Sequence, residues 1–108
     1  MKNPTRAEKL YWTRLVETIG CIACHLDGNQ NPSATIHHMD GRTKPGAHSK
    51  VLPLCAGHHQ DGTDTDTSKI AIHPWKRRFE AKYGTQEWLK AKCDKILSEQ
   101  TDGAMNAS

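Results

Sequence analysis

Two short motifs of metal-binding type constrain this sequence more than any other feature. The first is Cys21-x-x-Cys24 and the second is Cys55-x-x-His58, with residues 25–54 between them. Two thiolates at this spacing can reach one centre from a tight turn, and the second pair completes a tetrahedral set of four ligands. We therefore predict that these four side chains form a closed structural zinc site.

The composition indicates why such a site would help the chain to fold. The sequence has 108 residues, of which 35% are hydrophobic and 6% aromatic, so we expect one domain with a thin core. Zinc binding in small domains contributes about 10 kcal/mol to folding. The fourth cysteine, Cys93, falls on the apolar face of a predicted helix and is expected to be a core thiol.

Other classes of protein are excluded by simple features. The sequence has no run of about 18 apolar residues and no apolar segment near its start, so we expect neither a membrane span nor a signal peptide. A cytoplasmic location follows as an expectation, and disulfides are rare in that compartment. The net charge of +3 permits a polyanionic partner.

The residue pattern predicts an α+β fold in which helices flank a small central unit. A capping box at Thr5 and Glu8 begins the first helix, and Gly20 ends it. Short strands are expected at 34–36 and 51–54. The predicted organisation is a single domain over 1–100, made of an N-terminal helix (5–19), a zinc-bracketed core (21–73) and C-terminal helices (75–99), followed by a flexible tail (101–108).

Three histidines that lie between the zinc motifs or directly after them indicate a hydrolytic metal site. His37 and His38 are adjacent at the end of the first predicted strand, and His59 directly follows the last zinc ligand. A structural zinc finger has no need of an adjacent histidine pair. A hydrolytic metal site does, because it needs neutral imidazoles as ligands and another imidazole as a general base.

The order of these motifs resembles the His-Me finger (HNH, ββα-metal) nucleases, and the bracketing zinc knuckle resembles that of endonuclease VII-type enzymes. The segments GCIAC, ATIHHMDGR, HSKVLPLCAGHHQDG and AIHPWKRRFEAKYGT are similar to the Ref family of RecA-dependent nucleases, over residues 5–98. The resemblance implies a ββα-metal core and a phage or prophage protein of a bacterial host. It also implies a RecA filament as the partner.

The resemblance implies roles for individual histidines. His38 corresponds to the general base, and His37 and His59 correspond to ligands of one divalent ion, Mg²⁺ or Mn²⁺. The candidates for a third ligand are His73 and His48, and His73 is also a candidate for a second zinc site. Loss of a general base costs about 10²- to 10⁴-fold in rate.

One position departs from the HNH pattern. The central asparagine of the motif falls at Lys50, whose ammonium cannot accept a hydrogen bond from the base. We expect a backbone carbonyl near Val51 to orient His38 instead.

Basic side chains are the expected DNA contacts, because phosphate binding requires positive charge and tolerates any base sequence. The predicted contributors are Arg42, Lys44, Lys50, Lys76, Arg77 and Arg78.

The leading hypothesis is a monomeric, metal-dependent DNA endonuclease that cuts single-stranded DNA or recombination intermediates. One alternative is a zinc-knuckle module that binds nucleic acid without catalysis, and another is a recombination accessory protein. In the non-catalytic module His37 and His38 would be dispensable for binding.

Overall fold

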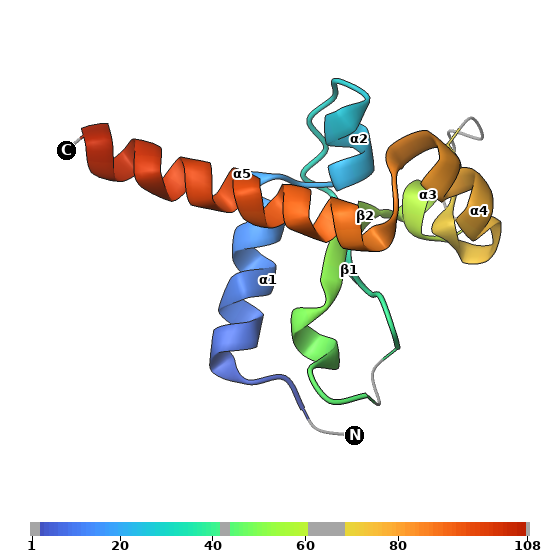
Figure 1. Ribbon diagram of the computed structural model, residues 1–108, viewed down its shortest axis with the longest axis horizontal. Helices are drawn as coiled ribbons and strands as arrows, with labels where there is room; N and C mark the ends of the chain where they lie inside the picture. The colour runs from blue at the N-terminus through green and yellow to red at the C-terminus, as the bar shows by residue number, and fades with distance from the viewer. Residues whose placement is uncertain (1–2, 42–43, 61–68, 108) are drawn as a thin grey trace.

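A computed structural model describes residues 3–41, 44–60 and 69–107, and Figure 1 shows its arrangement. The fold is α+β: a small antiparallel sheet is surrounded by helices. The elements are α1 (Arg6–Thr18), α2 (Ile22–Leu26), β1 (Ala34–His38), the 3₁₀ turn η1 (Ala47–Ser49), β2 (Val51–Cys55), α3 (Ala56–His59), α4 (Ile72–Tyr83) and α5 (Gln86–Ala107).

The predicted limits of α1 are confirmed. The Glu8 amide donates to Thr5 Oγ1 at 3.1 Å, and the Thr5 amide donates to Glu8 Oε1 at 2.7 Å, which completes the capping box. Gly20 follows the helix with φ of 72°, and a Cβ at this position would lie 2.3 Å from the carbonyl oxygen of Asn31. Glycine therefore permits both the turn and the close approach that begins the loop bearing Cys21.

The two strands pair antiparallel, with His37 opposite Leu52 and His38 opposite Val51. Side chains alternate across a strand, so Thr35 and His37 face one side of the sheet while His38 faces the other. Within the described residues β1 and β2 pair only with each other, so both are edge strands, and this accommodates the proline in β2.

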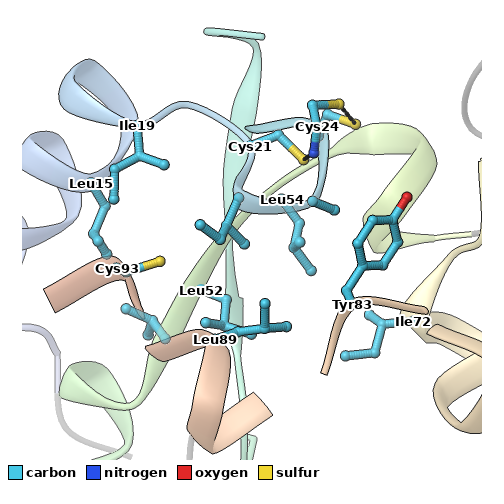
Figure 2. Packing of buried hydrophobic residues seen from close by; sticks show 14 of the residues in the cluster. Leu15, Ile19, Cys21, Cys24, Leu52, Leu54, Ile72, Tyr83, Leu89 and Cys93 are labelled. Carbon is cyan, nitrogen blue, oxygen red and sulfur yellow. Dashed lines mark hydrogen bonds between the residues drawn. The ribbon is translucent and has the colours of Figure 1, made fainter. Parts of the chain in front are cut away.

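The core lies between the sheet, α1 and α5. Leu15 comes from α1, Leu52 and Leu54 from β2, and Leu89 and Cys93 from α5, and all five are fully buried. Figure 2 shows these side chains in one cluster that continues toward Tyr83 and Ile72. Burying each leucine contributes about 2 kcal/mol. Cys93 is 0% exposed, which confirms that it is a core thiol.

The C-terminal helices begin and end differently from the prediction in two places. Helix α4 begins at Ile72, before the predicted residue 75, and non-helical backbone angles at His73 and Trp75 separate its first residues from its regular part. Helix α5, in contrast, continues to Ala107, beyond residue 99 where the predicted helices end. No proline interrupts this segment, and one glycine costs a helix only about 1 kcal/mol.

None of the helices in the described part of the chain is both long and apolar enough to cross a membrane.

Candidate metal centres

The first candidate centre brings together the four residues predicted to hold zinc. Cys21 and Cys24 lie at the start of α2 and in its body, Cys55 ends β2, and His58 lies in α3. The Nδ1 atom of His58 is 3.5, 3.5 and 3.2 Å from the sulfurs of Cys21, Cys24 and Cys55, respectively. The sulfurs of Cys24 and Cys55 are 3.8 Å apart.

These separations fit a tetrahedral zinc ion. Zinc–sulfur bonds of about 2.3 Å and zinc–nitrogen bonds of about 2.0 Å place sulfur about 3.8 Å from sulfur and about 3.5 Å from nitrogen. All four side chains are buried, as a closed structural site requires. The residues present therefore fit zinc in number, chemistry and spacing.

Neighbouring donors support negative charge on the sulfurs. The Cys24 amide lies 3.4 Å from the sulfur of Cys21, the Asn31 amide group lies 3.6 Å from the sulfur of Cys24, and the Lys69 ammonium lies 3.6 Å from the sulfur of Cys55. Burial raises the pKa of both Cys21 and Cys24 in the metal-free chain. A bound cation opposes that effect, because the thiolate is the form that ligates a metal.

Two residues that the sequence did not single out orient His58. The Tyr83 hydroxyl donates to Asp27 Oδ2 at 2.7 Å, so its oxygen accepts from Nε2 of His58 at 3.1 Å. His58 therefore carries its proton on Nε2 and directs the lone pair of Nδ1 at the sulfurs. Partners of this kind around a ligating histidine fix its tautomer and ring orientation.

The second candidate centre consists of His37, His59 and His73. One ring nitrogen from each lies within 4.8 Å of the others. The ring centre of His37 lies 5.1 Å from the ring centre of His59 and 5.0 Å from that of His73. A β-bridge between Gln60 and His73 brings the start of α4 beside the end of α3. Of the two predicted candidates for the third ligand, His73 joins this group.

This three-histidine cluster is open on one side. His37 is buried, His59 is half-buried and His73 is exposed. Burial lowers the pKa of His37 to about 4 and also lowers the pKa of His59, and repulsion between the neighbouring imidazoles acts in the same direction. Neutral imidazoles are the form that binds metal ions, so the cluster fits a divalent ion that keeps some ligand positions open.

His38 belongs to a separate group on the other side of β1. Its Nε2 lies 3.0 Å from Nδ1 of His48, and the two rings are 5.1 Å apart. The Trp12 ring stands edge-on to His38 at 5.4 Å, and its indole N–H donates to the His48 carbonyl at 2.7 Å. The predicted base is thus adjacent to His37 in sequence but contacts different elements.

The predicted DNA-contacting side chains lie at the surface where the structure describes them. Lys50 forms an exposed ion pair with Asp40 at 3.8 Å, and the Arg78 guanidinium lies 5.6 Å from the centre of the Trp75 ring. Arg42 lies outside the described residues. The other exposed members of the predicted set are Lys44, Lys76 and Arg77.

The fold is a small α+β protein with two groups of side chains that could hold a metal ion, one closed and rich in sulfur and one open and rich in imidazole. The chain belongs to the family described as "Recombination enhancement, RecA-dependent nuclease", which it matches over residues 4–98. This confirms the resemblance to the RecA-dependent nucleases that the sequence shows. The family description is that of nucleases, and hence of enzymes, that act in recombination.

Proposed function

We propose that the protein is a metal-dependent DNA endonuclease of the His-Me finger (HNH, ββα-metal) class, and that an endonuclease VII-like zinc knuckle stabilises its fold. Family membership supports nuclease activity. The observation that carries the proposal further is the three-histidine cluster, which is built from the end of β1, the end of α3 and the start of α4. The order β1, β2, α3 is the order that a ββα-metal core requires.

The proposed catalytic ion is Mg²⁺ or Mn²⁺, bound by His37, His59 and His73. Nitrogen ligands favour Mn²⁺ over Mg²⁺, because Mg²⁺ prefers oxygen. When bound, the ion supplies Lewis-acid stabilisation of the charge that develops on the phosphate. The exposure of His73 supports access of a phosphodiester to this cluster.

His38 is proposed as the general base that accepts a proton from the attacking water. The contact between its Nε2 and Nδ1 of His48 supports this role, because a general base works from a fixed ring orientation. His48 then serves the purpose expected of a carbonyl near Val51. Because His37 and His38 face opposite sides of β1, the proposal requires the reacting phosphate to lie at the end of this strand, where both residues can reach it.

The proposed substrate is RecA-bound single-stranded DNA or a displacement loop. Lys76, Arg77 and Arg78 support binding of a phosphate backbone near the cluster, because they follow His73 closely on α4 and are exposed. Contacts with phosphate alone give little sequence preference.

The decisive experiment incubates the zinc-loaded protein with circular single-stranded DNA and with a RecA-paired displacement loop, with and without Mg²⁺ or Mn²⁺. We expect cleavage that requires the added ion and falls at least about 100-fold in His38→Ala. His25→Ala is the matched control, because His25 is an exposed histidine outside both clusters.

Absence of cutting by the wild-type protein under all of these conditions would overturn the nuclease proposal. DNA binding that persists without cutting, and that is unaffected by His38→Ala, would instead support the non-catalytic nucleic-acid-binding module. Metal analysis tests the zinc knuckle separately, with one zinc per chain expected.

A further inference from the structure

We propose that Thr35 and Gln86 are positioning residues that determine which ring nitrogen His59 and His37, respectively, present to the catalytic ion. This inference rests on the proposed three-histidine metal site, and it does not depend on the DNA substrate. Neither residue has a role in the motifs read from the sequence.

The case for Thr35 follows from its single hydroxyl proton. Its Oγ1 lies 3.0 Å from the Leu54 carbonyl oxygen, which can only accept a hydrogen bond, so the hydroxyl proton points there. The same Oγ1 lies 3.1 Å from Nδ1 of His59. The oxygen must therefore accept at this second contact, which places the proton of neutral His59 on Nδ1 and leaves the lone pair on Nε2.

The case for Gln86 follows from the atom it presents. Its Oε1, which can only accept, lies 2.8 Å from Nε2 of His37. The proton of neutral His37 is therefore on Nε2, and the lone pair is on Nδ1. Gln86 is 6% exposed, and its backbone amide donates to Glu80 Oε2 at 3.2 Å, so the start of α5 holds this side chain in place.

The two contacts repeat the arrangement at the zinc site. There the Tyr83 oxygen accepts from Nε2 of His58 and leaves Nδ1 for the metal. In each case an oxygen acceptor takes one ring N–H and leaves the lone pair of the other ring nitrogen for a metal. Thr35 and Gln86 are uncharged, so they orient the rings without adding negative charge. This suits an ion that must remain accessible to substrate and water.

The test measures Mn²⁺ binding to the zinc-loaded protein by calorimetry. We expect Thr35→Val and Gln86→Met each to weaken Mn²⁺ binding by about 10- to 100-fold, the usual cost of losing such a partner. Thr35→Ser and Gln86→Glu keep an acceptor oxygen and should restore binding. Thr13→Val is the matched control, because the Thr13 hydroxyl donates to the Lys9 carbonyl within α1.

Nitrogen-15 chemical shifts of the imidazoles give a second readout that a purely structural role would not move. In the metal-free cluster of the zinc-loaded protein, His59 should carry its proton on Nδ1 and His37 on Nε2. Loss of this preference in the Val and Met variants supports the proposal. The opposite tautomers in the wild type, unchanged Mn²⁺ affinity in both variants, or no Mn²⁺ binding at all would overturn it.

These outcomes are separable from failure of the proposed function. A protein with the stated tautomers and Mn²⁺ affinities that cuts no DNA would retain this inference and lose the nuclease proposal. A protein that cuts DNA, and whose two variants bind Mn²⁺ with unaltered affinity, would retain the nuclease proposal and lose this inference.

Discussion

The Tyr83 hydroxyl oxygen lies 3.1 Å from Nε2 of His58 and accepts a hydrogen bond from it, so a residue of α4 determines how a residue of α3 faces the three cysteines. Removing this oxygen in Tyr83→Phe leaves a buried N–H without its acceptor, which costs about 1–3 kcal/mol. We predict that zinc affinity, measured by competition with a chelating dye, falls by about 10- to 100-fold.

Tyr11→Phe is the control for this prediction. Tyr11 also donates to a carboxylate, that of Asp94 at 2.6 Å, and this bond joins α1 to α5. Its loss should lower the melting temperature and leave zinc affinity unchanged. Equal zinc affinities in the two variants would show that the Tyr83 contact does not support the metal.

His73 and His48 are expected to behave differently when each is replaced by alanine. His73→Ala should abolish Mn²⁺ binding at the three-histidine cluster, because it removes one of three ligands. His48→Ala should leave Mn²⁺ binding intact and lower the rate of cleavage, because His48 contacts the base and not the cluster. Calorimetry and single-turnover cleavage distinguish the two effects, and loss of Mn²⁺ binding in His48→Ala would contradict the assignment.

The stability contributed by His37 should depend on pH. Burial lowers its pKa to about 4, below the value of about 6.5 for an unfolded histidine. The unfolded chain therefore binds more protons between these values, and the contribution is complete above pH 6.5 and is lost as pH falls toward 4. The free energy of unfolding in urea, compared between wild type and His37→Asn, should converge as pH decreases through this window. A difference that is constant from pH 7 to pH 4.5 would refute this.

Cys93 should be unreactive in the folded protein. Burial raises its pKa to about 12, so the thiolate is scarce at pH 8, and the side chain is 0% exposed. We expect a thiol reagent to modify no cysteine of the native zinc-loaded protein and all four in denaturant with a chelator. One equivalent of rapid reaction in the native state would place Cys93 at the surface.

The basic start of α4 should contribute charge and not sequence specificity. Replacing Lys76 and Arg77 by glutamine removes two phosphate contacts, so the slope of log affinity against log salt for single-stranded DNA should decrease by about 0.7 for each. Fluorescence anisotropy at several salt concentrations measures this slope. Lys9→Gln, on the exposed side of α1, should leave it unchanged.

The cluster of Cys21, Cys24, Cys55 and His58 could be predicted from the sequence because the spacing within each motif is local. The capping box at Thr5 and the turn at Gly20 could be predicted for the same reason. The alternation of His37 and His38 across β1 follows from the period of a strand and was available from the sequence. Thr35, two positions before His37, shares its face by the same rule.

The partners supplied by distant elements could not be predicted in this way. Gln86 reaches His37, and Tyr83 and Asp27 reach His58, only because α4 and α5 pack back against the sheet. Nothing in the local pattern around Gln86 marks it as a hydrogen-bond acceptor for a strand residue. The contact of His38 with His48 likewise depends on the path of the long connection between β1 and β2.

Helix α3 is only four residues long, and its last two, His58 and His59, belong to different metal centres. Such a short helix has almost no stability of its own, so zinc bound at His58 would add to the contact with Thr35 that holds His59 in place. Assembly would then follow a fixed order, in which zinc binding at the first centre precedes ordering of the three-histidine cluster. Under the proposed function, a newly made chain that lacks zinc would be an inactive precursor.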